Sequence, residues 1–183
     1  MRIHAEPAIL TVLQTVPLFR QLGEEPLRAL ARKSTMSELS EHEVLFTEGD
    51  PADEILLVMS GSIRLTCDMG EGPEIVVGYV KAGDILGEMS IIDPAPRSAS
   101  ARAAEASVVL HVPSVVFNEF LADGHPVARA LILGIRQMMT QRIRVLNERI
   151  EALFLIDAET NLDDGASVSS RLREIWSTVR AGG

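Results

Sequence analysis

Residues 83–101 read GDILGEMSIIDPAPRSASA and depart from the alternation of an ordinary strand. A glycine followed by a carboxylate and small residues at the start of a short helix offers free backbone N–H groups and the positive end of a dipole, which favour an anion. Arg97, preceded by a rigid proline, can donate to two oxygens of a phosphate, and Ser98 adds a hydroxyl donor. Glu88 would repel a bare phosphate but can accept hydrogen bonds from a sugar hydroxyl. This combination predicts a nucleotide site.

Around this stretch, residues 41–113 have the pattern of a β-structure. Short apolar or alternating runs such as VLFTEGD, ILLVMSGSIRLT and EIVVGYV are separated by glycines and other turn residues. Their spacing predicts a small antiparallel β-roll, jelly-roll-like, of about eight strands. Residues 7–40 are predicted to form N-terminal helices, because Leu10, Leu13 and Val16 recur at helical spacing. The expected fold class is α+β.

The helical pattern returns over residues 114–154, which complete a domain predicted to span 1–154. Nine apolar side chains recur there mostly at steps of three and four, and this stripe is longer than one small β-roll can cover alone. We therefore expect a homodimer through the long C-terminal helix; alternatively, one short helix in the tail, residues 155–183, folds back over the stripe. The residues expected at the interface are Ile135, Met139, Leu146, Ile150 and Leu153.

Segments between residue 10 and about 154 resemble, in the same order, one known family. Residues 87–101 are similar to the phosphate-binding cassette of the cyclic nucleotide-binding domain family. That family includes the catabolite activator protein, protein kinase A regulatory subunits and cyclic-nucleotide-gated channels. The other similar segments are PLF at residues 17–19, FTEGD at 46–50, SGSI at 60–63 and RIRVLNE at 142–148.

The resemblance implies a role for each matching position. Glu88 would hold the ribose 2′-hydroxyl, and Arg97 the exocyclic oxygens of the cyclic phosphate. The backbone of Gly87 and Met89, with Ser98, would hold the rest of the phosphate. Alternatively, Glu88 and Arg97 pair with each other in a site without a ligand. The full set of expected ligand-binding residues is Gly87, Glu88, Met89, Ser90, Arg97, Ser98, Ala99, Leu146 and Asn147.

The sequence indicates the residues that would bind the nucleobase less directly than those that would bind the phosphate. In the family the nucleobase meets the long C-terminal helix, and Leu146 and Asn147 stand where the bacterial activators have small hydroxyl residues. Leu146 could only pack against a base, whereas Asn147 could hydrogen-bond to adenine or guanine. The expected ligand is cAMP, with cGMP as the alternative, and no metal is expected. Ser90 also fits as an ordinary turn residue.

Composition argues against several other functions. The formal charge of −9 disfavours a protein that coats nucleic acid, and the 29 residues after Phe154 are too few for the helix-turn-helix domain of bacterial transcription factors. A single cysteine, Cys67, cannot form an internal disulfide or a thiolate cluster. The four histidines form no H-x-H pair, which disfavours a metal enzyme of the cupin type. The apolar runs are too short for a membrane span, and no signal peptide is recognised.

The sequence therefore predicts a stand-alone cyclic nucleotide receptor rather than an enzyme. It is expected in the cytoplasm, without nucleic acid or membrane partners, and to act through contacts with an effector protein that the sequence does not identify. Two alternatives share the same fold. One is an interaction module without a ligand, and the other is a module that binds a cyclic dinucleotide.

Overall fold

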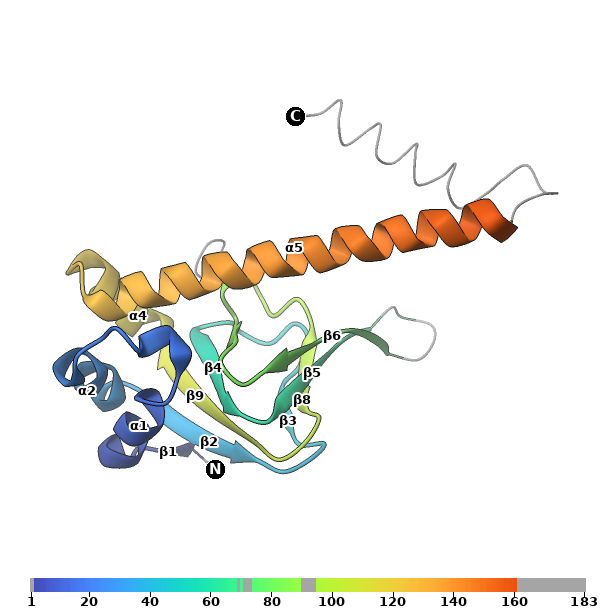
Figure 1. Ribbon diagram of the computed structural model, residues 1–183. Coiled ribbons are helices and arrows are strands. Elements are labelled where there is room, and N and C mark those ends of the chain that lie inside the picture. The colour runs from blue at the N-terminus through green and yellow to red at the C-terminus, as the bar shows by residue number, and fades with distance from the viewer. Residues whose placement is uncertain (1, 69, 71–73, 90–94, 161–183) are drawn as a thin grey trace. The chain divides into compact units, whose positions relative to one another are not determined.

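Figure 1 shows the computed structural model of the chain. The residues that the structure describes are 2–68, 70, 74–89 and 95–160. The chain divides into two compact units, Met1–Met138 and Met139–Gly183, and the boundary falls within helix α5 (Pro126–Thr160). Both sheets belong to the first unit. Among the described residues, no helix is long and apolar enough to span a membrane.

Short helices precede most of the strands. Helix α1 (Glu6–Leu13) is followed by the 3-10 helix η1 (Pro17–Phe19), which begins at a proline because proline fits the first turn of a helix but not its interior. Helix α2 (Glu24–Arg32) has acidic residues in its first turn and Arg32 in its last, which complements the helix dipole. These helices bury the side chains of Ile9, Leu13, Phe19, Leu27, Leu30 and Ala31.

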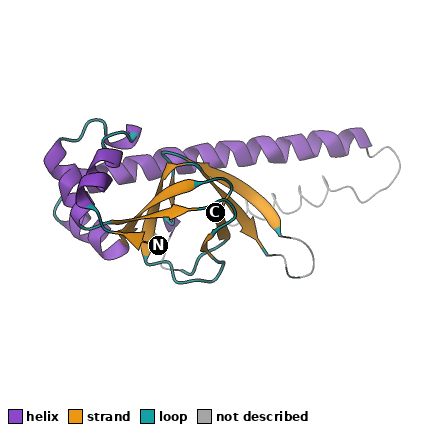
Figure 2. Cartoon of the chain, turned by 90° about the horizontal axis from the view of Figure 1, so that it is seen from below, coloured by secondary structure: helices purple, strands orange, loops and turns teal. Residues whose placement is uncertain are grey.

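The described strands form two antiparallel sheets (Figures 1 and 2). The larger sheet has the strand order β1-β2-β9-β4-β7, and the smaller has the order β3-β8-β5-β6. Strands β2 to β9 form the predicted roll, so the α+β fold class is confirmed. The strands are β1 Arg2–Ile3, β2 Thr35–Leu39, β3 Val44–Phe46, β4 Glu54–Ser60, β5 Ser62–Cys67, β6 Ile75–Lys81, β7 Ile85–Leu86, β8 Ser100–Ala103 and β9 Ser107–Pro113.

The prediction that residues 7–40 are helical is wrong at the C-terminal end of this range. Residues 35–39 form strand β2, which pairs with β9 on one side and with β1 on the other. Ser37 and Leu39 are buried while Glu38 between them is exposed, which is the period of a strand. Five residues are too few to distinguish a strand from the end of a helix, so pairing with distant strands decides the conformation. The roll therefore begins at residue 35 rather than 41.

Side chains from both sheets meet inside the roll. Both sheets contribute branched residues, and β8 of the smaller sheet adds two alanines that leave room for them. Each buried member of this cluster is at most 7% exposed, so the interior of the roll is well packed. The buried members are Leu39, Leu56, Val58, Ile63, Val80, Leu86, Ala101, Ala103 and Val109.

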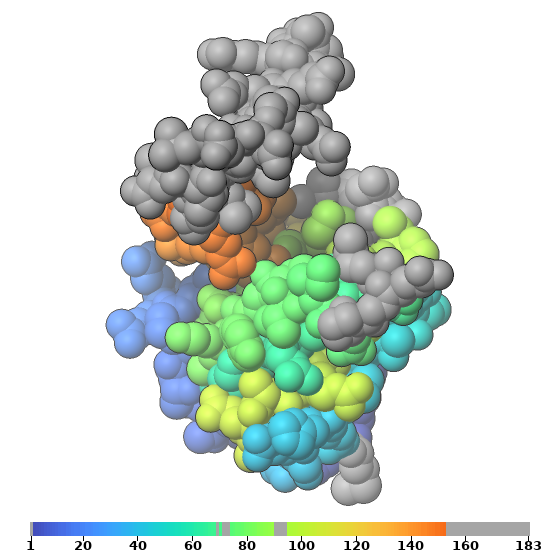
Figure 3. All heavy atoms as spheres, turned by 90° about the vertical axis from the view of Figure 1, so that its right-hand side faces the viewer, coloured from blue at the N-terminus to red at the C-terminus, as the bar shows by residue number. Residues whose placement is uncertain are grey.

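Strand β6 forms an outer edge of the smaller sheet and keeps apolar side chains in contact with water. Ile75, Val76, Val77 and Tyr79 are 44–57% exposed. The strand is green in the space-filling view of Figure 3. A register shift in its pairing with β5 interrupts the ladder at Val77, and such irregularities make an edge strand a poorer template for pairing with another chain.

Two helices follow the roll. Helix α4 (Ser114–Ala122) is separated from α5 by a short turn. A Cβ added to Gly134 of α5 would lie 2.7 Å from Leu18 Cδ1 and 3.2 Å from Ile85 Cδ1, so this glycine lets α5 approach η1 and β7 closely. Ile135, which the sequence places at a subunit interface, is only 8% exposed in the single chain. Its burial in the first unit removes it from the expected dimer surface.

Candidate functional site

The backbone of Arg97 is fixed to the turn between β3 and β4. The N–H of Arg97 donates to the carbonyl oxygen of Asp50, and the N–H of Gly49 donates to the carbonyl oxygen of Arg97, both at 2.9 Å. The turn itself is closed by the N–H of Thr47, which donates to the Asp50 carboxylate at 2.7 Å. The roll therefore determines the position of the Arg97 Cα atom.

The guanidinium of Arg97 is buried, and the whole residue is 7% exposed. Its Cζ atom lies 4.5 Å from the centroid of the Phe46 ring, a cation–π contact. Nη2 donates to the carbonyl oxygen of Glu54 at 3.1 Å. Nε and Nη1 are buried and donate to no atom of the described residues. These N–H groups are therefore donors without a partner in a buried position, which anionic oxygens of a ligand could satisfy.

Gly87 is needed for this arrangement. Its φ angle is +75°, in the left-handed region that disfavours any residue with a Cβ atom. A Cβ at this position would also collide with Nη1 of Arg97 and would lie 2.8 Å from the Glu54 carbonyl oxygen. The absence of a side chain at Gly87 therefore lets the guanidinium lie against the backbone that follows β7.

Glu88 adds a carboxylate beside the arginine and is 3% exposed. Burial lowers the pKa of the Arg97 guanidinium, and the negative charges of Glu54, Asp53, Glu88 and Asp50 oppose this effect. An arginine keeps its proton at neutral pH in any protein environment. The charge of Arg97 is therefore compensated by carboxylates while two of its hydrogen-bond donors remain open. Such a site suits a ligand that presents anionic oxygens together with hydroxyl groups.

The predicted cassette residues fall into two groups. Gly87, Glu88 and Arg97 are buried or partly buried, and the structure brings Gly87 against Arg97 across ten residues of sequence. Met89 is 57% exposed, and Ser98 is also exposed. Ala99 is partly buried. The ligand contacts of all these residues stay predictions.

The remaining predicted site residues lie elsewhere. Ser90 lies outside the described residues. Leu146 and Asn147 are exposed on α5 and belong to the second unit of the chain. Their contact with a base stays a prediction.

Sequence reasoning did not identify Phe46 and Glu54 as parts of the site. Phe46 ends β3, and Glu54 begins β4, so neither is near Arg97 in the sequence. One feature of the sequence could have indicated Glu54. Glu54 is the only charged residue in the run EILLVMS, and a charge at the start of an apolar strand needs a partner.

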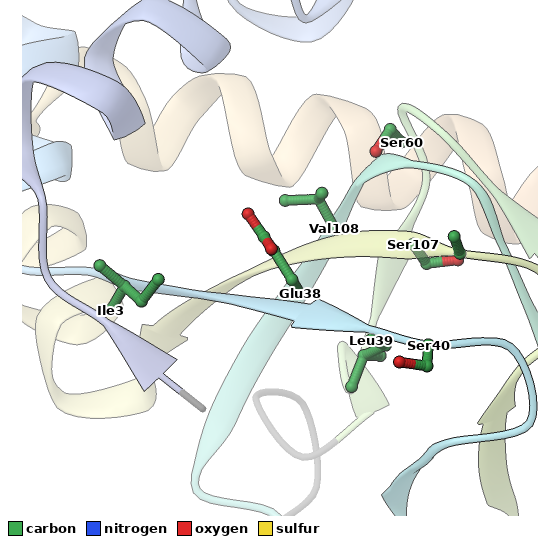
Figure 4. A pocket seen from close by; sticks show the side chains of 8 residues that line it. Ile3, Glu38, Leu39, Ser40, Ser60, Ser107 and Val108 are labelled. Carbon is green, nitrogen blue, oxygen red and sulfur yellow. The ribbon is translucent and has the colours of Figure 1, made fainter.

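A separate pocket lies on the larger sheet, as Figure 4 shows. Its polar lining comes from Glu38 and the hydroxyl groups of Ser40, Ser60 and Ser107. The hydroxyl of Ser107 already donates to the carbonyl oxygen of Glu105 at 2.8 Å. Neither the cassette residues nor Phe46 and Glu54 line this pocket, so it is distinct from the site around Arg97.

Comparison with known proteins places these features in one family. The family model for the cyclic nucleotide-binding domain matches residues 36–123. A cyclic nucleotide-binding-like protein from Brucella abortus is 31% identical, with a TM-score of 0.50, and the match covers 63% of this chain and 98% of that chain. A roll with an arginine site built in this way is that of a cyclic nucleotide-binding domain. The chain belongs to the cyclic nucleotide-binding domain family.

Two further relatives show how far the similarity extends. A cyclic nucleotide-binding domain from Methylobacillus flagellatus is 28% identical, with a TM-score of 0.66, and the match covers 80% of this chain and 83% of that chain. The CRP-like cAMP-activated global transcriptional regulator of Mycobacterium tuberculosis is 22% identical over 146 residues, or 80% of this chain. The chain spans 63% of the length of that regulator.

Proposed function

We propose that this chain is a regulatory protein that binds cAMP between Gly87, Glu88 and Arg97 and passes the signal on by contact with another protein. The single observation that carries the proposal is the pair of open donors on Arg97. Nε and Nη1 are buried without a partner among the described residues, and a buried unsatisfied donor costs about 1–3 kcal/mol. Oxygens of a bound cyclic nucleotide would supply acceptors for these donors.

The choice of cAMP rests on the relatives rather than on the site. The mycobacterial regulator is described as cAMP-activated, whereas a Trypanosoma brucei protein of the same fold is the regulatory subunit of a cAMP-independent protein kinase A. Asn147 can hydrogen-bond to either purine. The identity of the base is therefore the part of the proposal that most needs measurement.

Isothermal titration of the purified chain with cAMP and cGMP tests the proposal. We expect saturable binding of one nucleotide per chain, tighter for cAMP than for cGMP. A cyclic dinucleotide such as cyclic di-GMP is titrated in parallel. Binding of the dinucleotide alone, or of none of the three by a folded protein, would contradict the proposal.

Glu88→Ala is expected to weaken binding of cAMP by about 5-fold to 150-fold, because an unpaired ribose hydroxyl costs about 1–3 kcal/mol. Wild-type protein should bind 2′-deoxy-cAMP less tightly than cAMP, and the variant should bind the two almost equally. Both affinities are measured by calorimetry. Glu119→Gln serves as the control, because Glu119 pairs with Lys33 on the surface at 2.5 Å. Equal wild-type affinity for both nucleotides would remove Glu88 from the proposed site.

The second part of α5 is proposed to join two copies of the chain. Met139, Ile143, Leu146 and Ile150 follow one another at steps of four, three and four residues, the spacing of a two-stranded coiled coil. Ile143 and Leu146 are 57% and 56% exposed in the single chain. Each large apolar side chain left in water forgoes about 1.5–3 kcal/mol of burial, so pairing of two helices is favoured.

Light scattering at tens of micromolar is expected to give the mass of a dimer, and Ile143→Glu to give the mass of a monomer. The charge would be buried in the helix pair, which is strongly unfavourable. Val115→Glu is the matched control, because Val115 is an exposed apolar residue on α4, 63% exposed. A monomeric wild-type protein, with and without cAMP, would argue against this interface.

A further inference from the structure

A buried hydrogen-bonded network lies next to the arginine site. His111, 2% exposed, accepts or donates a hydrogen bond at each ring nitrogen. Its Nδ1 lies 3.0 Å from Oε1 of Glu54, and its Nε2 lies 2.7 Å from Oγ of Ser37. Arg2 holds the same carboxylate with two hydrogen bonds, Nη2 to Oε1 at 2.6 Å and Nη1 to Oε2 at 2.9 Å. We refer to Arg2, Ser37, Glu54 and His111 as the Glu54 network.

The Glu54 network crosses the larger sheet and ends at the nucleotide site. Its members come from β1, β2, β9 and β4, four consecutive strands in the order of this sheet, and β7 is next. Glu54 lies two residues before Leu56, whose partner Leu86 immediately precedes Gly87. The carbonyl oxygen of Glu54 accepts the hydrogen bond from Nη2 of Arg97 at 3.1 Å. The side chain of Glu54 thus belongs to the network, and its backbone belongs to the site.

We propose that the Glu54 network positions Arg97 for the nucleotide phosphate. The inference rests on the proposed nucleotide-binding function. Pairing of β4 with β9 holds the backbone of Glu54, and Arg2 and His111 hold its side chain from two sides, which further restricts the movement of its carbonyl oxygen. Arg97 then has one nitrogen fixed by that carbonyl oxygen and two nitrogens open to the ligand.

The carboxylate of Glu54 is suited to binding Arg2 and His111. Burial raises the pKa of Glu54, but the hydrogen bonds and charges of His111 and Arg2 outweigh burial and hold its pKa below the usual value. The carboxylate therefore stays ionised at neutral pH.

A hydroxyl, an imidazole and a carboxylate in this order also occur in serine hydrolases. Ser37 is only 5% exposed, and neither Ser37 nor His111 lines the pocket of Figure 4. A nucleophile must reach its substrate, and this hydroxyl is closed off inside the sheet. The geometry points to positioning rather than to catalysis.

The variant Glu54→Gln distinguishes an effect on the position of Arg97 from the effect of removing a negative charge. The substitution removes a negative charge close to an anion site, so charge alone predicts tighter binding of cAMP. Loss of positioning predicts the opposite, and we expect affinity to fall by about fivefold or more. Arg2→Gln should act in the same direction, and Arg2 has a side chain 54% exposed, so this variant leaves the core intact. Glu119→Gln, an ion-pair variant on the surface, should keep the wild-type affinity.

The outcomes separate the two proposals. If wild-type protein binds neither cAMP nor cGMP, the proposed function fails and the inference fails with it. If wild-type protein binds cAMP and the folded variants Glu54→Gln and Arg2→Gln bind it unchanged or more tightly, the inference alone is overturned.

Discussion

Arg97→Ala is expected to lower the affinity for cAMP by about 30-fold to several thousand-fold. The side chain has donors at Nε and Nη1 that are buried without a partner among the described residues, and Nη1 lies where a side chain at Gly87 would be. Removing one partner of a desolvated charge pair costs about 2–5 kcal/mol, because the other partner stays buried without compensation. In this case the uncompensated partner is the phosphate of the nucleotide.

Calorimetry of Arg97→Ala and Arg97→Lys measures this loss. Lysine restores the positive charge but not the donors at Nε and Nη1, so its affinity should lie between those of the alanine variant and the wild type. The backbone of Arg97 is held by the turn at Gly49 and Asp50, so the alanine variant should keep its fold, which thermal unfolding checks. Wild-type affinity in the alanine variant would show that the phosphate binds elsewhere.

Gly87→Ala is expected to weaken cAMP binding by about tenfold to 150-fold. The new methyl group would meet the space that Nη1 of Arg97 occupies, so the guanidinium must move away from its place. Each hydrogen bond to a charged group contributes about 1.5–3 kcal/mol, and hydrogen bonds weaken steeply once their geometry is lost. The variant should also lose stability, because alanine is strained at a φ angle of +75°.

The variant Gly83→Ala separates the effect of backbone strain from the effect of collision with Arg97. Gly83 has a φ angle of +94°, and a Cβ there would meet nothing within 4 Å. This variant should therefore lose stability to a similar extent, by about 1–2 kcal/mol, and keep its affinity for cAMP. Thermal unfolding and calorimetry of both variants provide the comparison. Equal losses of affinity in the two variants would mean that strain, not collision with Arg97, causes the effect.

The cassette could be predicted from sequence because its functional residues lie close together in the chain. Gly87, Glu88 and Arg97 fall within eleven residues, and a glycine, a carboxylate and an arginine at that spacing have a direct chemical meaning. The roll could be predicted because its strands repeat a simple pattern. The assignment of residues 35–39 to a helix was wrong because hydrogen bonds to β1 and β9, not local preference, make them a strand.

Residues that are distant in the sequence but close together in the structure could not be found in this way. Phe46, Glu54 and His111 come from three separate strands, and of the three only Glu54, a charge at the start of an apolar run, stands out in the sequence. Only the tertiary structure shows that the carbonyl of Glu54 meets Arg97. The roles of Leu146 and Asn147 depend on a helix face, and their contact with a base stays a prediction.

The strand order of the larger sheet has a consequence for the biosynthesis of the protein. Strand β9 lies between β2 and β4, although it is the last of the described strands to be synthesised. Contacts between segments so distant in sequence form slowly and depend on closure of long loops. His111 reaches Glu54 only when β9 inserts between its neighbours. A nascent chain therefore has no complete Glu54 network until all its strands are synthesised, and cAMP, once bound, would stabilise only the finished roll.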